Sequence, residues 1–377
     1  MNEFAGLKEE IVAYSKTIGI DKIGFTTADV FAELKERLIT QEKLNYQSGF
    51  EKGTVEERTE PRRLLPGAQS IIAIALAYPT KMKDAPKSSP GNRRGIFSRS
   101  SWGTDYHIVL EDKLKKLAAF IAEKVDDFQY KIMVDTGELS DRAVAERAGI
   151  GFSGKNCSII TEEYGSFVYL GEMITNIPFQ PDKPVELSCG DCRICLDACP
   201  TGALVQGGQL DAKRCLSYLS QTKVNLPEPF KEKLGTRLYG CDTCQLVCPY
   251  NKHVDFHLHP EFEPEPEVAK PLLIPMLQKS NREFREMFGH VSGFWRGKNP
   301  LQRNAIIALA HYKDETAVDV LYDLLINDVR PMIRETAAWA LGKIGTEKAK
   351  ALLQQALDKV DEANVQHEIK NALKRIE

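Results

Sequence analysis

The sequence predicts an α+β protein of several domains, and three observations lead to this prediction. Residues 1–177 alternate helical and strand-like patterns of apolar residues. Eight of the nine cysteines lie between Cys189 and Cys248. From residue 281 onward the pattern is wholly helical and repeats itself. We therefore expect a mixed α/β domain, a cysteine-rich domain, a linker and a helical repeat domain, over residues 1–177, 178–260, 261–280 and 281–377.

In the first domain, helical and strand patterns follow one another closely. We expect helices at 7–18, 110–125 and 141–148. We expect strands at 22–26, 70–78, 131–134 and 166–174. The apolar run from Ser70 to Tyr78 has the length of a buried strand, well short of the ~20 residues that span a membrane. A domain with these elements is large enough to hold a sizeable cofactor.

The composition is that of an ordinary soluble protein, with 42% hydrophobic and 27% charged residues. The N-terminus, MNEFAGLKEE, is polar and acidic and lacks the parts of an export signal. We therefore expect a cytoplasmic protein without a membrane span. A reducing compartment does not favour disulfides, so the clustered cysteines are expected to bind metal.

The first run of cysteines has the spacing C-x2-C-x2-C-x3-C-P, from Cys189 to Pro200. Bacterial ferredoxins with two iron–sulfur clusters use this run, and its fourth cysteine ligates the other cluster. A second run, from Cys241 to Pro249, lacks one cysteine, which only Cys215 can supply. We therefore assign one [4Fe–4S] cluster to Cys189, Cys192, Cys195 and Cys248, and the other to Cys199, Cys215, Cys241 and Cys244.

Zinc is the alternative metal, because paired CxxC motifs also form zinc ribbons. Zinc sites do not use the CxxCxxCxxxCP run, however, so iron–sulfur clusters are favoured. Two adjacent clusters transfer electrons and imply a redox centre that receives them. Cys157, the ninth cysteine, is expected to be a small apolar structural residue.

The C-terminal domain repeats itself. Pro300 and Arg303 recur as Pro331 and Arg334, 31 positions later. Each repeat has the pattern of two helices joined by a short turn, as in HEAT-like arrays, whose stacked helix pairs present an extended surface. A stabilising appendage without a binding partner is the alternative.

The formal net charge of −3 does not by itself indicate a nucleic-acid-binding protein, but two segments are basic. The loop 79–103 contains Lys81, Lys83, Lys87, Arg93, Arg94 and Arg99 against Asp84 alone. The start of the repeats contains Arg282, Arg285, Arg296, Lys298 and Arg303 against Glu283 and Glu286. The first segment is equally consistent with a solvated, mobile loop, whereas the second suits a polyanion.

Two segments of the first domain could take part in chemistry. Asp135 ends the strand 131–134 and begins a DTG triplet, but a single triplet does not make an aspartic protease. It is either a turn-forming aspartate or a proton donor in a shielded cleft. The glycine-rich segment 149–156 lacks the spacing of a phosphate-binding or dinucleotide-binding loop. It is either a helix C-cap with a tight turn or a backbone surface that a bulky planar cofactor approaches closely.

Long strings of the chain resemble the bacterial epoxyqueuosine reductases. These strings are MVDTGELSDRAVAERAGIGFSGKN, the cysteine framework, HLHPEFEPEPE, NREF, FGHVSGFWRGK and the helical repeats. The resemblance implies a cobalamin cofactor beside two [4Fe–4S] clusters, and reduction of epoxyqueuosine to queuosine at the wobble position of tRNA. It also implies a low-potential electron donor, and we expect a monomer. Nothing in the composition or spacing of the chain indicates cobalamin by itself.

The resemblance further implies roles for individual residues, with Asp135 as the proton donor. The residues expected to line the cobalamin are Arg58, Ser98, Asp135, Ser153, Gly154, Lys155, Asn156, Ser217, Gln221, Thr222 and Lys223. The residues expected to contact tRNA are Arg93, Arg94, Arg282, Arg296, Lys298 and Arg303. Reduced cobalt would attack the epoxide or transfer electrons to it, while a buried aspartic acid protonates the oxygen.

Two other functions fit parts of the sequence. A cobalamin-dependent reductase of the reductive dehalogenase type would share the clusters and the cofactor, but the missing export signal and the C-terminal repeats disfavour it. An electron-transfer scaffold protein would use the clusters as an electron path and the repeats as a docking surface. Such a scaffold would contain no corrinoid, so a tightly bound one would exclude it.

Overall fold

The computed structural model describes residues 4–376 of the chain and divides it into two compact units. Unit 1 consists of Met1–Lys81, Thr104–Cys215 and Asp242–Glu263, and unit 2 of Met82–Gly103, Leu216–Cys241 and Pro264–Glu377. The domain boundaries drawn at residues 177 and 260 therefore both fall inside unit 1. The cause is that the chain leaves unit 1 and returns to it, so that each unit is assembled from three separate stretches.

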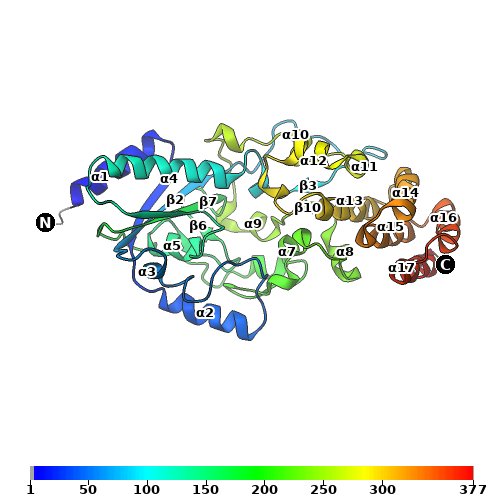
Figure 1. Cartoon of the computed structure of the whole chain (residues 1–377), viewed down its shortest axis with the longest axis horizontal. Helices are drawn as coiled ribbons and strands as arrows, with labels where there is room; N and C mark the ends of the chain where they lie inside the picture. Colours follow the sequence, from blue (N-terminus) through cyan, green and yellow to red (C-terminus); the bar gives the residue numbers. More distant parts are fainter. Residues whose placement is uncertain (1–3, 377) are drawn as a thin grey trace. The chain divides into compact units, whose positions relative to one another are not determined.

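Unit 1 is built on a four-stranded antiparallel sheet with the strand order β1–β2–β7–β4 (Figure 1). The strands are β1 (Lys22–Thr27), β2 (Ser70–Ala77), β7 (Val168–Thr175) and β4 (Tyr130–Met133). All eight residues of β2 are buried, which explains why this strand is apolar without alternation. The four strands expected from the sequence are confirmed to within two residues at each end.

Helices cover both faces of this sheet (Figure 1). On one face, α1 (Ala5–Thr17) and α4 (Tyr106–Ala122) share a core with Ile72, Ile74 and Leu76 of β2. On the other face, α5 (Asp141–Arg147) packs with the alternate residues Ile71, Ala73 and Ala75. The period of two along β2 thus distributes its side chains between two cores. Unit 1 also contains α2 (Ala32–Lys43), α3 (Pro61–Leu64), β5 (Phe152–Ser153), β6 (Ile159–Ile160), β8 (Leu204–Gln206) and β9 (Gln209–Leu210).

The cysteine-rich part of unit 1 contains only short elements: α6 (Ile194–Ala198), η2 (Ala212–Arg214), α9 (Thr243–Leu246), η3 (Pro249–Asn251) and η4 (Pro260–Phe262). Polar side chains fasten it to the segment that leads into β7. Asn251 Oδ1 accepts a hydrogen bond from the backbone amide of Ser166 at 2.7 Å, and Gln245 Nε2 donates to the Ser166 carbonyl at 2.9 Å. The loops that contain the cysteines are therefore anchored beside the sheet.

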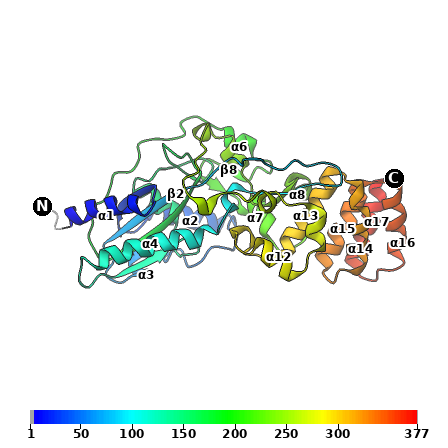
Figure 2. The same cartoon turned by 90° about the horizontal axis from the view of Figure 1, so that it is seen from above.

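Unit 2 contains the helical repeats (Figure 2). The helices are α12 (Asn281–Phe288), α13 (Lys298–Tyr312), α14 (Val318–Asn327), α15 (Pro331–Ile344), α16 (Glu347–Leu357) and α17 (Ala363–Ile376), with η5 (Ser292–Phe294) and η6 (Glu315–Ala317) between them. The repeated residues Pro300 and Pro331 lie at the beginning of α13 and α15, the two most buried helices of the array. The HEAT-like pairing expected from the sequence is confirmed.

The remaining elements of unit 2 are η1 (Arg99–Ser101), α7 (Leu216–Gln221), α8 (Glu228–Leu234), α10 (Pro266–Ala269), α11 (Leu273–Gln278) and a parallel pair of short strands, β3 (Ile96–Phe97) and β10 (Arg237–Tyr239). The segment 261–280 is ordered rather than a plain linker. It contains two of these helices, and Phe262 and Leu273 are completely buried. Prolines at 264, 266, 271 and 275 interrupt its apolar residues, so these give no regular helical period. Within the described residues, no helix is long and apolar enough to cross a membrane.

Candidate active site and iron–sulfur centre

Asp135 occupies a strained turn directly after β4. Its φ of 51° lies in the left-handed region, which aspartate tolerates better than most residues. The backbone amide of Thr136 donates to the Val134 carbonyl at 2.5 Å, which closes a three-residue turn around Asp135. A turn of this kind with a positive φ at its centre is the rarer and more strained form. The Asp135 side chain is 62% exposed, so it is accessible to a substrate rather than buried as the sequence suggested.

His107, on the first turn of α4, faces Asp135. Nδ1 of His107 lies 2.7 Å from Oδ1 of Asp105, the N-cap residue of α4. Nε2 of His107 lies 3.4 Å from Asp135 Oδ2. Burial opposes a charge on His107, but the contacts with Asp105 and Asp135 outweigh it and raise its pKa to about 9. The same His107 contact lowers the pKa of Asp135. At neutral pH the proton of this pair therefore resides on the imidazole.

Two further carboxyl groups belong to this region, Asp141 at the start of α5 and Glu172 in the middle of β7. Sequence reasoning did not select His107, Asp141 or Glu172. A signal existed for Glu172, because it is the single charged residue in the apolar strand VYLGEMIT. For His107 there was only the adjacent N-cap aspartate, and its proximity to Asp135 depends on tertiary structure.

Arg58, Ser153 and Gly154 line a cavity of about 600 Å³ in unit 1. Burial lowers the pKa of Arg58, and the backbone amide of Ser153 donates to Glu146 Oε1 at 2.9 Å. A β-carbon at Gly154 would lie 2.6 Å from Asn156 Oδ1, so other side chains of the protein pack closely against the backbone at this position. Cys157 also lines this cavity and is partly exposed.

Four of the cysteines surround one cavity, of about 280 Å³, which Lys155 and Asn156 also line. These are the four assigned to one cluster from their spacing: Cys189, Cys192, Cys195 and Cys248. The backbone amide of Lys155 points at Cys189 Sγ at 3.4 Å. Asn156 is 6% exposed, and its Nδ2 has no hydrogen-bond partner among the described residues. Four thiols around one cavity, with a backbone amide directed at one of them, suit an iron–sulfur cluster.

The Lys155 side chain contacts the loop that contains the cysteines. Its ammonium donates to the carbonyls of Gly190 at 2.5 Å and Cys192 at 2.9 Å. It therefore clamps the cysteine loop and brings a positive charge to the thiolate-lined cavity, which favours reduction of a cluster there. The glycine-rich segment thus connects the cavity beside Arg58 with the cysteines.

Three cysteines of the second set belong to unit 1, namely Cys199, Cys215 and Cys244, whereas Cys241 belongs to unit 2. Burial raises the pKa of the Cys199 thiol, but backbone amides of Thr201, Ala203 and Leu204 outweigh it, so the pKa is lowered. Amide groups directed at sulfur stabilise the thiolate that a metal requires. Among the described residues, no three Cys, His, Asp or Glu side chains converge as a single-ion site would need.

The other residues expected at the cofactor lie in unit 2 and are held there by the repeats. Ser98 is buried, and its backbone amide donates to the Tyr239 carbonyl at 2.9 Å. Gln221 Oε1 accepts from Trp295 Nε1 at 2.8 Å, and Thr222 is buried, whereas Lys223 is exposed. Ser217 is partly exposed on α7.

The expectation that Arg303 contacts tRNA is wrong, because its side chain is completely buried. Its Nη1 donates to the carbonyls of Thr222 at 2.7 Å and Val224 at 2.6 Å, and its Nη2 to that of Leu219 at 2.8 Å. The guanidinium thereby occupies the C-terminal end of α7, where backbone carbonyls lack helical partners. Burial lowers the pKa of Arg303 to about 9, so it remains charged at neutral pH.

The other five arginines and lysines expected at tRNA differ in availability. Arg93 pairs with Asp314 at 3.2 Å, and Arg94 with Glu267 at 2.9 Å, so both fasten their loop to the rest of unit 2. Lys298 is partly exposed and donates to the Lys279 carbonyl. Arg282 is 87% exposed and pairs with Glu286, as expected for a surface residue. Arg296 is partly exposed, with its guanidinium 4.9 Å from the Trp295 ring.

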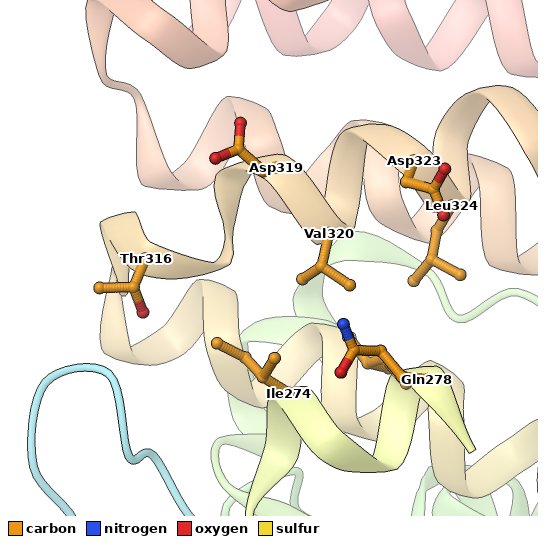
Figure 3. Close-up of a pocket in the computed structure, with 8 residues that line it drawn as sticks. Ile274, Gln278, Thr316, Asp319, Val320, Asp323 and Leu324 are labelled. Atoms are coloured by element: carbon orange, nitrogen blue, oxygen red, sulfur yellow. The ribbon is translucent and has the colours of Figure 1, made fainter.

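Unit 2 also contains a groove of about 570 Å³ between α11 and α14 (Figure 3). Val320 and Leu324 of α14 point toward Ile274 and Gln278 of α11, whereas the Asp319 carboxylate points away from them and pairs with Lys348.

The fold and the site define an oxidoreductase that combines an α/β domain, iron–sulfur clusters and a HEAT array. The family described as epoxyqueuosine reductase QueG, DUF1730, matches residues 58–136. The 4Fe-4S double cluster binding domain matches residues 188–251, which include all eight assigned cysteines, and HEAT repeats match residues 297–374. The chain belongs to the epoxyqueuosine reductase family.

The relatives that support this are similar over almost their whole length. The epoxyqueuosine reductase of Bacillus cereus is 62% identical over 98% of both chains. A solved epoxyqueuosine reductase in complex with an epoxyqueuosine-modified tRNA-Tyr stem loop has a TM-score of 0.96 and 62% identity, covering 98% of this chain and 99% of that one. A Bacillus subtilis structure, also with a TM-score of 0.96 and 62% identity over 99% of both chains, has its catalytic aspartate loop swung out of the active site.

Proposed function

We propose that this chain reduces the epoxide of epoxyqueuosine to give queuosine at the wobble position of tRNA, with cobalamin, two [4Fe–4S] clusters and Asp135 as the proton-delivering residue. The observation that carries the proposal is the exposed Asp135 side chain, 3.4 Å from His107 and located in the same compact unit as the four-thiol cavity. A redox centre and an accessible proton donor are the two requirements of a reductive C–O bond cleavage.

Cobalamin would be held in unit 1 by Arg58 and by the backbone of Ser153 to Asn156. The fit rests on the cavity of about 600 Å³ that Arg58, Ser153 and Gly154 line. Ser98 and the residues from Ser217 to Lys223 belong to unit 2, and their role at the cofactor stays a prediction from the sequence. When bound, cobalamin supplies a strongly reducing cobalt centre that cleaves the epoxide C–O bond.

The chain itself supplies protons and orientation. Conversion of the epoxide to an alkene consumes two electrons and two protons and releases the oxygen as water. His107 carries the proton of the pair at neutral pH. We therefore propose that His107 returns a proton to Asp135 after each proton transfer from Asp135 to the substrate. Covering Asp135 with substrate and cofactor would remove it from water and raise its pKa, which favours the protonated acid at the moment of reaction.

Unit 2 is proposed to bind the tRNA. Arg282 and Lys298 are positively charged and can bind phosphates. Lys223, two residues after the end of α7, is exposed. Trp295 is 53% exposed and has Arg296 against its ring, an arrangement on which an unpaired base can stack. Arg93 and Arg94 are proposed only as supports of their loop. We place the enzyme in the cytoplasm as a monomer that receives electrons from a low-potential donor.

The experiment is a direct conversion assay. The anaerobically reconstituted chain is incubated with cobalamin, a low-potential reductant and an anticodon stem loop that contains epoxyqueuosine, and the nucleosides are analysed. We expect queuosine to appear, and only when cobalamin is present. Recovery of unchanged epoxyqueuosine from a protein with about eight iron atoms per chain would contradict the proposal.

A further inference from the structure

We propose that the buried Glu172 and the partly exposed Asp141 form a carboxyl pair that shares one proton and thereby holds the Asp135 turn in place. Both would then be positioning residues for the proton transfer, and the inference rests on the proposed function. The three acidic residues lie on different elements: Glu172 in β7, Asp141 at the first residue of α5, and Asp135 after β4.

Glu172 lies where a carboxylate is least stable. It occupies the centre of β7, opposite Ala73 of β2 and Met133 of β4. Its residue is 1% exposed, on the face of the sheet that the apolar side chains of α5 cover. Oε1 of Glu172 has no hydrogen-bond partner among the described residues. A lone acid buried in this way is rarely tolerated without a purpose.

Asp141 connects Glu172 to the active site. Its Oδ2 accepts a hydrogen bond from the backbone amide of Asp135 at 2.7 Å. Its carboxyl group is also in hydrogen-bond contact with the Glu172 side chain. Two carboxylates cannot form that contact, so a proton must lie between them. Burial and then the charge of Asp135 raise the pKa of Asp141 to about 6.

At neutral pH the shared proton therefore belongs to Glu172. Burial, followed by the charge of Asp141, raises the pKa of Glu172 well above its usual range. The neutral Glu172 donates to ionised Asp141, which in turn accepts from the Asp135 amide. This arrangement is a chain of two hydrogen bonds from the core of the sheet to the turn.

The surrounding charges make this chain sensitive to pH. The groups that face it are Tyr106 and His107 of α4, Asp135 of the turn and Arg142 of α5. His107 neutralises Asp135, and Arg142 adds a weaker attraction to Asp141. The only charges that act on Glu172 among the described residues are those of Asp141 and Asp135, both negative. Ionisation of Glu172 would therefore place a further negative charge beside Asp141 and break the contact.

The turn needs such support because its backbone is strained. A non-glycine residue in the left-handed region costs about 1 to 2 kcal/mol relative to its preferred conformations. The Asp135 amide donates to Asp141 and to no other described group. Loss of Asp141 as an acceptor would therefore let the turn relax and remove the Asp135 side chain from His107.

The test is amide hydrogen exchange of the segment 134–139 in the full-length, cluster-loaded chain without substrate, measured between pH 6 and pH 10. In the parent protein, protection should fall above neutral pH by more than base catalysis explains. In Glu172→Gln, whose amide donates to Asp141 but does not titrate, protection should stay constant. Asp141→Ala should lack protection at every pH. The matched control is Glu123→Gln, an exposed glutamate at the end of α4.

Turnover gives a second measurement. The kcat of the parent should fall on the alkaline side with little change in KM, and Glu172→Gln should keep its kcat to higher pH. Identical pH profiles of protection in the parent and Glu172→Gln would overturn the inference, as would full protection in Asp141→Ala. The exchange measurement needs neither substrate nor cobalamin. A failure of the proposed function would instead appear as a lack of queuosine from a parent protein that shows the predicted exchange.

Discussion

Each unit contains a fully buried ionisable side chain, Arg303 in unit 2 and Glu172 in unit 1, and their surroundings differ. Arg303 in unit 2 has its guanidinium donors directed at four backbone carbonyls and two side-chain oxygens. Glu172 in unit 1 has an oxygen without a partner and only negatively charged neighbours. Burial of an ionisable side chain therefore serves a different purpose in each unit. A satisfied group stabilises a fold, whereas an unsatisfied one beside other acids indicates proton chemistry.

The same contrast extends to the surrounding residues. In unit 2, Arg93, Arg94 and Arg334 each have an acidic partner or a backbone acceptor. In unit 1, Asn156 has an unpartnered amide in the cavity of the cysteines, and the Asp135 turn is strained. The contrast is limited to these residues, because Gln302 Oε1 and Trp339 Nε1 in the repeats are also buried without a hydrogen-bond partner among the described residues.

The largest effect is expected from removal of a cluster ligand. Cys189→Ser should abolish the cluster assigned to Cys189, Cys192, Cys195 and Cys248, so that iron falls from about eight to about four atoms per chain. Chemical iron analysis after anaerobic purification gives the number. All three tryptophans belong to unit 2, so their fluorescence should be unchanged in this variant. An unchanged iron content would show that Cys189 is not a ligand.

The second effect concerns stability. Arg303→Met leaves several carbonyls at the end of α7 without donors, and breaking a buried charged network of this kind costs about 3 to 5 kcal/mol. Denaturation followed by tryptophan fluorescence reports unit 2 alone and should register this loss. The control is Arg282→Met, at an exposed position, with an expected change within about 0.5 kcal/mol. If the two variants were equally stable, the claim that the buried hydrogen bonds of Arg303 stabilise unit 2 would be contradicted.

A smaller effect is expected from Glu172→Gln on the pH dependence of stability. Glu172 has a raised pKa in the folded state, so its stabilising contribution is complete below about pH 4.5 and is lost as the pH rises toward the folded pKa. Within that window the parent should lose up to about 1.4 kcal/mol per pH unit more than the variant. Chemical denaturation followed by far-ultraviolet circular dichroism measures this. Parallel pH curves would contradict the pKa assignment.

The smallest effect is expected at the surface of unit 2. Arg282→Glu combined with Lys298→Glu should weaken binding of the anticodon stem loop several-fold. The slope of log affinity against log salt should decrease by roughly 0.7 to 0.9 for each lost phosphate contact. Binding titrations at several salt concentrations give both values. Charge reversal of Glu286 to lysine serves as the opposite control and should not weaken binding.

The features that local pattern encodes could be predicted from the sequence. The apolar run of β2 is buried on both faces, and the spacing of Cys189, Cys192 and Cys195 predicts a shared cavity. The role of Arg303 could not be predicted from charge alone, because a count of basic residues does not show which of them are buried. Its recurrence as Arg334 was the available signal, since both arginines are buried in equivalent helices. The contact between Asp141 and Glu172 joins residues on separate elements, so it depends on the sheet.

The measurement that tests the central claim most directly is single-turnover conversion of epoxyqueuosine in the stem loop by the parent chain and by Asp135→Asn, with iron and corrinoid quantified in both samples. The asparagine keeps the size of the side chain but cannot deliver a proton. We predict equal cofactor contents and a rate reduced by about 10² to 10⁴-fold in the variant. An unchanged rate with equal cofactor contents would contradict the assignment of Asp135 as the residue that protonates the substrate.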